Sequence, residues 1–349
     1  MRIAMGVAYG PGQDFHQAVD QLADYERAGV DMVQVPELYG FDGVSRLGYI
    51  AAKLSRVELA SSILQTYPRT PTLMAMTAAG LDSVSRGRFN LGIGASGPQV
   101  IEGFHGVPYD APVGRTRELI EICRLVWRRE PLVYHGKYYT LPLPDEQGTG
   151  LGKPLKMIDH PLRERIPITV AAIGPKNVAL TAELAEGWQP PFFVPEKAAD
   201  VWSRPLADGN AKRDPSLGPL DLHVGVSLAI GDDVDHLHEL GRPQRALYIG
   251  GMGARGRNFY NNLATWFGYA DEAKEIQDLY LAGKKKEAEA AVPRDLLVKT
   301  SLIGSAGHVR DRLAALREAG VTTLSVRPLA DDHATRVELI EHLRTLCDA

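Results

Sequence analysis

The chain alternates short apolar runs with longer stretches in which apolar residues recur every three or four positions. The short runs end at glycine, proline or polar residues, as buried strands do. In the longer stretch after Asp14, apolar positions share one helical face, Asp14 suits the N-cap, and Gly29 suits the residue after the last turn. The pattern predicts strands over 3–9, 32–36, 57–64, 88–94, 166–173, 187–193, 222–230 and 323–326, and further helices over 44–54, 71–86, 115–128, 176–185, 196–207 and 334–346.

The junction between helix and strand repeats along the chain. The segment Glu26–Val35 resembles Arg317–Val326, and Ala182–Trp188 is a looser copy; in each, a helix ends at glycine and passes directly into a strand. Eight strands separated by helices indicate parallel βαβ units. A closed (β/α)8 TIM barrel fits best, and a doubly wound open sheet is the alternative. We predict one α/β domain over 1–349, with helical and loop insertions at about 95–114, 131–165 and 232–295.

Composition and charge narrow the classes of partner. The 349 residues are 44% hydrophobic and carry a net charge of −4, so no basic field favours nucleic acid or anionic lipid. No stretch is long and apolar enough to span a membrane, and the N-terminus enters a strand at once without a signal-peptide pattern. Cys123 and Cys347 are far apart, the histidines show no paired-ligand spacing, and no metal site is expected. These features predict a cytoplasmic protein with a small-molecule partner.

Polar residues follow two of the predicted strands. In a barrel of this kind the active site lies at the carboxyl ends of the strands. Glu37 directly follows the second strand, where it could act as a general base or accept a hydrogen bond from a ligand. A helix-capping or salt-bridged glutamate is the equally weighted alternative. Ser61 and Ser62 inside the third strand suggest a bulge or a close backbone approach, and Arg69 could bind an anion or lie at the surface.

Glycines cluster at the end of the fourth strand. Gly92, Gly94 and Gly97 fall within six residues, and such a turn can bring backbone N–H groups close to an anion. An ordinary strand–helix turn is the alternative, and the position on the fourth strand rather than in a first βα unit does not support a Rossmann site. A second candidate lies at Ala172–Asn177, where the fifth strand meets its helix. Together they predict an anion-binding side near strands four and five.

Several stretches resemble the luciferase-like monooxygenase superfamily, and more closely its F420-dependent oxidoreductase branch. The matching stretches are Ser61–Leu64, 77–94, Ala95–Val100, Arg115–Glu118, Leu125–Trp127 and Gly136–Tyr139.

The resemblance implies a (β/α)8 barrel that holds a flavin or deazaflavin at the strand ends, most closely coenzyme F420, with FMN as the alternative. In F420 members a non-proline cis peptide bond backs the deazaflavin ring, and its position falls on Ser62–Ile63. The glycine loop would hold the cofactor tail, and Glu37 matches an acidic position at the ring edge. The implied cofactor-binding residues are Glu37, Ser62, Ile63, Gly94, Ala95, Ser96, Gly97, Pro98, Gln99, Ala172 and Gly174.

Two departures bear on the substrate. Members that oxidise sugar phosphates carry a histidine after the acidic position and a glutamate in the glycine loop, where this chain has Leu38 and Gly97. Both changes remove titrating groups, so oxidation of glucose 6-phosphate is not expected. Aromatic residues at the barrel mouth favour a bulky, partly apolar substrate. The lining candidates are Tyr9, Tyr39 and Tyr67 as substrate contacts, with Phe41, Phe104, His105 and Tyr109 beside them.

Three functions follow from the resemblance. In the first, an F420-dependent oxidoreductase transfers hydride between the deazaflavin and an organic substrate, and Glu37 or His105 handles a proton. In the second, an FMN-dependent monooxygenase uses reduced FMN and O2. In the third, a non-catalytic barrel only binds or stores the cofactor. The family resemblance also leads us to expect a homodimer.

Overall fold

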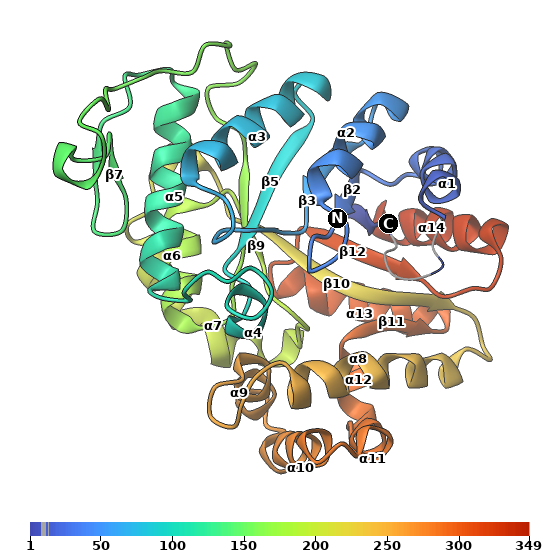
Figure 1. The fold of residues 1–349 in the computed structure, drawn as a ribbon. Coiled ribbons are helices and arrows are strands. Elements are labelled where there is room, and N and C mark those ends of the chain that lie inside the picture. Colours follow the sequence, from blue (N-terminus) through green and yellow to red (C-terminus); the bar gives the residue numbers. More distant parts are fainter. Residues whose placement is uncertain (8–11, 13, 349) are drawn as a thin grey trace.

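The computed structural model describes residues 1–7, 12 and 14–348. Parallel strands form a central barrel and helices surround it (Figure 1). The strands are β1 (Arg2–Gly6), β2 (Met32–Val35), β3 (Glu58–Ser61), β4 (Leu64–Gln65), β5 (Phe89–Gly94), β6 (Tyr134–His135), β7 (Thr140–Leu141), β8 (Ile168–Ala171), β9 (Gly187–Gln189), β10 (Asp221–Ile230), β11 (Ser301–Gly304) and β12 (Thr323–Pro328).

The α-helices follow the strands that the sequence pattern predicts, and more of them fill the segment before β11. They are α1 (Phe15–Arg27), α2 (Gly43–Lys53), α3 (Pro71–Val84), α4 (Pro98–Ile101), α5 (Pro112–Trp127), α6 (Pro175–Leu184), α7 (Pro195–Asn210), α8 (Arg242–Ala246), α9 (Phe259–Trp266), α10 (Ala270–Leu281), α11 (Lys285–Ala290), α12 (Arg294–Lys299), α13 (Ala306–Glu318) and α14 (His333–Asp348). Short 3-10 turns lie at Asp145–Gln147, Pro215–Leu217 and Asp235–Gly241, and a π-turn, η4, lies at Leu247–Gly251.

Strand pairing closes the barrel, which confirms the predicted TIM fold. The strand order runs from β10 through β12, β1, β2, β3, β5 and β8 to β9, and β9 pairs back to β10 at its N-terminal end. Every pairing within the barrel is parallel. The C-terminal part of β10 pairs with β11, with Ser227 opposite Ser301 and Ile230 opposite Gly304.

Local signals explain where many elements begin. Asp14 caps α1 by accepting a hydrogen bond from the Gln17 N–H, and Gly29 has a φ of +103°, as the sequence predicts. The turn 136–139 joins β6 and β7 into an antiparallel hairpin. Two elements differ from the prediction: the third strand is interrupted between Ser61 and Leu64, and β11 was not predicted.

The three segments expected as insertions lie outside the barrel strands. The segment 95–114 contains α4, and 131–165 carries the β6–β7 hairpin beyond α5. The segment 232–295 contains α8 to α11 and the start of α12, and α9, α10 and α11 lie together at one side of the barrel (Figure 1). No helix within 1–7, 12 and 14–348 has the length and apolar character that crossing a membrane requires.

The apolar core lies between the strands and the helices, whereas polar side chains reach inside the barrel. Inside the barrel, Ala4, Met32 and Ala60 form a small separate cluster. At the N-terminal ends of the strands, Glu58 accepts a hydrogen bond from Asn90 (2.6 Å) and forms an ion pair with Arg2 (2.8 Å). The N-terminal end of the barrel is therefore tied together by charged and polar groups.

Asp221 at the start of β10 belongs to the same end of the barrel. It accepts hydrogen bonds from His223 Nε2 (2.8 Å), Thr323 Oγ1 (3.0 Å) and Thr322. Burial alone would raise the pKa of Asp221, but these hydrogen bonds and the His223 charge outweigh it and lower the pKa to about 2. The carboxylate is therefore stabilised in its ionised form by the folded state.

Candidate active site

The third and fifth strands approach each other closely at the carboxyl end of the barrel. The Ser61 hydroxyl donates to the Gly92 carbonyl (2.8 Å) and accepts from the Gly92 N–H (2.9 Å). A Cβ atom at Gly92 would lie 1.8 Å from the Ser61 carbonyl oxygen, so only glycine fits there. The Ser62–Ile63 peptide bond that follows is cis, as the resemblance leads us to expect. The paired serines thus mark the close backbone approach that the sequence suggested.

Ser62 and Ile63 lie against residues of β9 and β5, respectively. Gln189 at the end of β9 donates from Nε2 to Ser62 Oγ (3.0 Å). The Ile63 side chain lies 3.0 Å from the position of a Cβ atom at Gly94, which keeps β5 close to this segment. Gln189 was not among the predicted site residues, because only the folded barrel brings the end of β9 to Ser62, two strands beyond the β5 neighbour of β3.

The Gly94–Gln99 loop leaves β5 and enters the short helix α4. Ser96 has a left-handed φ of +58°, and Gly97 precedes the helix with open space where a Cβ atom would stand. The Tyr109 hydroxyl donates to the Ser96 carbonyl (3.2 Å), which ties the following segment to the loop. The loop therefore has the open, glycine-lined form that a cradle needs.

Glu37 lies in a buried ion pair. Its carboxylate accepts from Arg69 at 2.5 and 3.0 Å, and the Gly43 N–H at the start of α2 donates to Oε2 at 2.8 Å. The side chains of Glu37 and Arg69 are only 8% and 15% exposed. Both carboxylate oxygens are therefore occupied, and the geometry favours the salt-bridged, helix-capping interpretation of Glu37 over a general base. Arg69 is neither a surface residue nor a free anion site.

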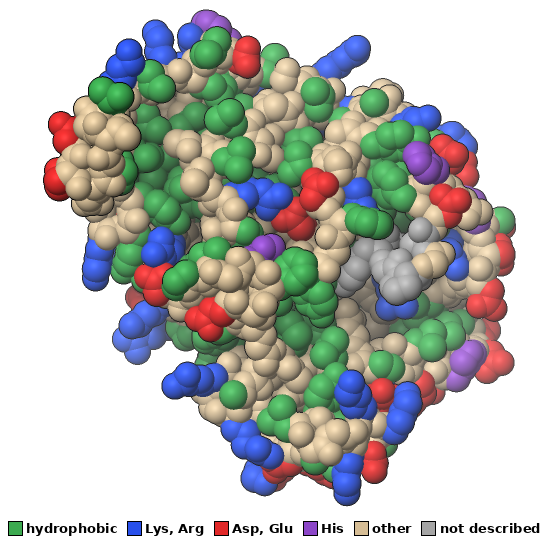
Figure 2. Space-filling view, viewed as in Figure 1, with side chains coloured by type: hydrophobic (Ala, Val, Ile, Leu, Met, Phe, Trp, Pro, Cys, Tyr) green, Lys and Arg blue, Asp and Glu red, His purple; other side chains and the backbone are tan. Residues whose placement is uncertain are grey.

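The predicted substrate contacts fall into separate groups. Tyr39 is 64% exposed and packs against Phe104 (6.0 Å between ring centroids), and His105 lies edge-on to Phe104 (5.2 Å). Tyr67 stacks on Tyr109 (5.0 Å), donates to the Asp110 carbonyl (2.6 Å), and has a pKa raised by burial and by the neighbouring Tyr109. Figure 2 shows hydrophobic side chains exposed near the centre of the face on which α4 lies in Figure 1. Tyr9 lies outside the described residues.

In the second predicted cradle, Ala172–Asn177, some backbone groups already have hydrogen-bond partners within the protein. The Ala172 carbonyl accepts from Trp188 Nε1 (3.0 Å), and the Ile173 carbonyl accepts from Trp202 Nε1 (3.3 Å). Gly174 precedes α6 with no side-chain cap, and a Cβ atom there would lie 3.9 Å from Phe259 of α9. The carbonyls of Ala172 and Ile173 are therefore already used by the fold. Gly174 lies where α9 of the insertion meets the barrel.

Several buried polar atoms at this end of the barrel lack a hydrogen-bond partner. Gln65, which pairs with Gly94 in register, is 1% exposed, and neither its Oε1 nor its Nε2 has a partner. Thr66 Oγ1, His105 Nε2 and Asn177 Oδ1 are also buried and unpartnered. Buried polar atoms are satisfied in almost all native structures, so this group is the kind expected where a polar ligand completes the site. A glutamine inside an apolar strand was the available sequence signal.

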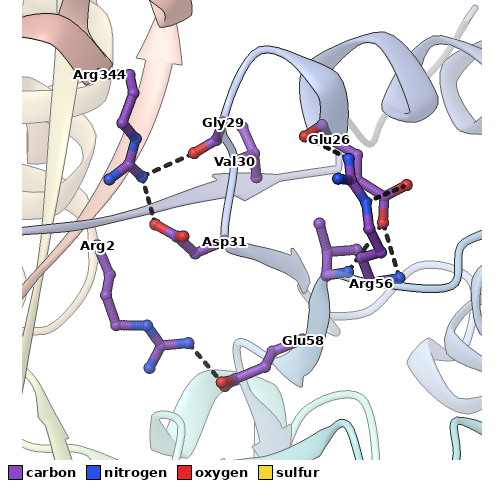
Figure 3. A pocket seen from close by; sticks show the side chains of 9 residues that line it. Arg2, Glu26, Gly29, Val30, Asp31, Arg56, Glu58 and Arg344 are labelled. Atoms are coloured by element: carbon purple, nitrogen blue, oxygen red, sulfur yellow. Dashed lines mark hydrogen bonds and ion pairs between the residues drawn. The ribbon is translucent and has the colours of Figure 1, made fainter.

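A cavity lined by charged residues lies at the other end of the barrel. Arg2, Asp31, Arg56 and Glu58 line it together with Glu26 and Arg344, at the N-terminal ends of the strands, with a volume of about 420 Å³ (Figure 3). Its charged groups are paired: Arg344 with Asp31, Arg2 with Glu58 and Arg56 with Glu26. Active sites of TIM barrels lie at the carboxyl ends of the strands. We therefore interpret this cavity as part of the ion-pair network that stabilises the N-terminal end of the barrel. No group of three or more His, Cys, Asp or Glu among the described residues is placed to hold a metal ion.

Comparison with known proteins identifies the family. A model of luciferase-like monooxygenases matches residues 2–323. The chain belongs to the luciferase-like monooxygenase family. It is 39% identical over 329 residues to a Mycobacterium tuberculosis protein described provisionally as a coenzyme F420-dependent oxidoreductase, covering 93% of this chain and 94% of that one.

Solved structures of this fold include both F420 and FMN proteins. The coenzyme F420-dependent tetrahydromethanopterin reductase from Methanopyrus kandleri has a TM-score of 0.78 at 21% identity, covering 98% of each chain. A type II Baeyer–Villiger monooxygenase from Pseudomonas putida, in complex with FMN, has a TM-score of 0.64 at 20% identity, covering 98% of this chain and 96% of that one. These likenesses establish the barrel fold and are shared by F420 and FMN proteins.

Proposed function

We propose that this luciferase-like enzyme is an F420-dependent oxidoreductase that transfers hydride between the deazaflavin and a bulky, partly apolar organic substrate. The observation that carries the proposal is the 39% identity, over nearly the whole length of both chains, to a relative described as F420-dependent. A homodimer remains a prediction from the family.

The residues at the carboxyl end of the barrel fit such a cofactor. The Gly94–Gln99 loop is open at Gly97, and the Gln65 amide is buried without a partner beside Gly94. A ring with hydrogen-bonding edges would satisfy an amide of this kind, because an unsatisfied buried polar group is destabilising by about 1–3 kcal/mol. The open loop and the unpartnered buried amide therefore support the fit of the cofactor.

Each predicted residue then has a distinct part. Bound F420 would supply the hydride-transfer centre. Ser62, Ile63 and Gly94 would support the ring, and the loop from Ala95 to Gln99 would hold the tail with Gly174. Glu37 acts as a positioning residue, since its ion pair with Arg69 ties the segment after β2 to the start of α3. His105, with its free Nε2, is the better placed of the two proton candidates.

The direct test is a fluorescence titration of the purified protein with oxidised F420, with FMN in parallel. Saturable binding of F420, together with no binding of FMN, supports the proposal. Binding of FMN alone, with O2 uptake when reduced FMN is supplied, would move the protein to the oxygen-using branch. Tight F420 binding without turnover across a panel of carbonyl, unsaturated and alcohol substrates would favour the non-catalytic alternative.

The variant Gln65→Leu tests the fit of the site itself. Removing an unpartnered amide should leave thermal stability unchanged or higher, whereas F420 affinity should fall by roughly 10-fold, the equivalent of one hydrogen bond of about 1.4 kcal/mol. Gly97→Ala is the matched control for folding, because its Cβ atom meets nothing within 4 Å. Unchanged F420 affinity in Gln65→Leu would show that the amide does not face the cofactor.

A further inference from the structure

Arg245 and the exposed Arg257 form no ion pair among the described residues, unlike the other arginines of the insertion. Arg242, Arg255 and Arg294 each form an ion pair, with Glu239, Asp278 and Asp235 respectively. Arg245, on α8, has no carboxylate oxygen within 4.0 Å among residues 1–7, 12 and 14–348. Its guanidinium contacts a neutral group, because Nη2 donates to Thr300 Oγ1 (3.1 Å), and its Nε is buried with no partner.

The surroundings of Arg245 are apolar and aromatic. The guanidinium carbon lies 5.1 Å from the centroid of the Phe192 ring, and the neighbouring ionisable group is the Tyr248 phenol. Burial lowers the pKa of Arg245 to about 10, so the group still carries its charge at neutral pH. An ionised group in such surroundings is destabilising unless a counter-charge accompanies it. Contact with an aromatic face offsets only part of this, about 1–2 kcal/mol.

Arg245 lies at the same end of the barrel as the proposed cofactor site. Phe192 follows β9 by three residues, at the carboxyl end of that strand. Its ring is 6.3 Å from Tyr260 of α9, whose pKa is raised by burial and by Tyr248 and Tyr109. Tyr109 is the residue that donates to the Ser96 carbonyl in the glycine loop. Phe192 and Tyr260 therefore connect the guanidinium with the region in which Tyr109 ties down the glycine loop.

We propose that Arg245 binds an anionic group, a phosphate or a carboxylate, of the ligand that occupies the barrel mouth. The planar guanidinium presents two parallel N–H groups that match a carboxylate or phosphate. The inference rests on the proposed function for the position of the ligand. The anion belongs either to the cofactor side chain or to the substrate, and the experiment separates these sources.

The first arm uses inorganic phosphate alone. Thermal unfolding is measured with increasing phosphate at constant ionic strength for wild type, Arg245→Met and the control Arg255→Met, which removes an exposed, paired arginine of the same insertion. A saturable rise in melting temperature in wild type and Arg255→Met, absent in Arg245→Met, supports the proposal. No rise in wild type, or an equal rise in Arg245→Met, overturns it.

A second readout excludes a merely structural role. Removing an arginine that has no carboxylate partner should leave the melting temperature unchanged or raise it, whereas a structural arginine would lower it. If Arg245→Met does not fold, Arg245→Lys takes its place: the charge remains but the paired donors are lost, so a reduced phosphate response supports the proposal and a full one overturns it.

The second arm identifies the source of the anion. If the anion is on the cofactor, Arg245→Met should bind F420 about 10- to 100-fold more weakly than wild type, which is the range for a hydrogen bond to a charged group. The same variant should bind a deazaflavin that lacks the anionic side chain with wild-type affinity. If F420 affinity is unchanged while the phosphate response is lost, the anion is on the substrate. If the wild-type protein does not bind F420, the proposed function is overturned. The phosphate-dependent change in melting temperature still tests the anion site, because that measurement does not involve F420.

Discussion

The ion pair between Glu37 and Arg69 gives a sharp prediction, because it separates two roles for Glu37. The pair joins residues 32 positions apart, is bidentate, and is largely removed from water. Replacing Glu37 with glutamine leaves the Arg69 cation buried without its counter-charge. Breaking a buried pair in this way is destabilising by about 3–5 kcal/mol.

The size of the effect can be expressed as a melting temperature. The entropy of unfolding of a chain of 349 residues is about 0.7 kcal/mol/K, so the loss corresponds to about 4–7 °C. Differential scanning calorimetry of Glu37→Gln, Arg69→Met and the double variant measures it. The double variant should lose less than the sum of the two single changes, because it leaves neither charge unpaired.

The competing role predicts a different pattern. If Glu37 is a general base, Glu37→Gln lowers kcat by 100-fold or more and leaves the melting temperature close to wild type. If it is a positioning residue, stability falls and F420 affinity weakens together. A Glu37→Gln variant that melts with wild type would refute the argument from the ion pair, whatever its activity.

Three further predictions concern the barrel and its thiols. Gly92→Ala should fail to fold or lose most of its stability, because its Cβ atom would overlap the Ser61 carbonyl, whereas Gly97→Ala should melt as wild type; expression and circular dichroism decide it. Asp221 has a lowered pKa of about 2, so it stabilises the folded state above its ordinary pKa, and this contribution of about 2 kcal/mol is lost as pH falls from about 4 to 2. Urea unfolding should therefore show a weaker pH dependence in that window for Asp221→Asn, and an unchanged slope would contradict it. Burial raises the pKa of Cys123 and Cys347, so a thiol reagent should label neither in the folded protein and both in urea; fast labelling of the native state would contradict it.

The barrel was predictable because its signals are local. A strand followed by an amphipathic helix is encoded within about 30 residues, and caps such as Asp14 and Gly29 mark the boundaries. The unusual third strand was also signalled, since Ser61 and Ser62 stand where apolar residues would otherwise be. β11 carried a weaker signal, because four residues after a helical insertion resemble the end of α12 as much as a new strand.

The pairings within the site were not predictable in the same way. Glu37 with Arg69, and Ser62 with Gln189, meet only because strands remote in sequence end at one rim. A lone glutamate after a strand cannot indicate whether an arginine will reach it, so both interpretations of Glu37 stood until the fold was known. Arg245 gave no signal at all, because an arginine is notable only when its surroundings lack a carboxylate.

The two ends of the barrel differ in how their polar groups are satisfied, and this difference locates the function. At the N-terminal end, the charges of Arg2, Glu58 and Asp221 are paired with one another or with polar neighbours, so a ligand would have to displace existing partners. At the carboxyl end, Gln65 is buried with its amide unpartnered, and the buried Nε of the partly buried Arg245 also lacks a partner. Evolution removes such groups when they serve nothing, because each lowers stability by about 1–3 kcal/mol. Several such atoms gather at the carboxyl end, on Gln65, Thr66, His105, Asn177 and Arg245, although His223 Nδ1 near the N-terminal end is also unpartnered. Their concentration at the carboxyl end is the physical reason to place the ligand there.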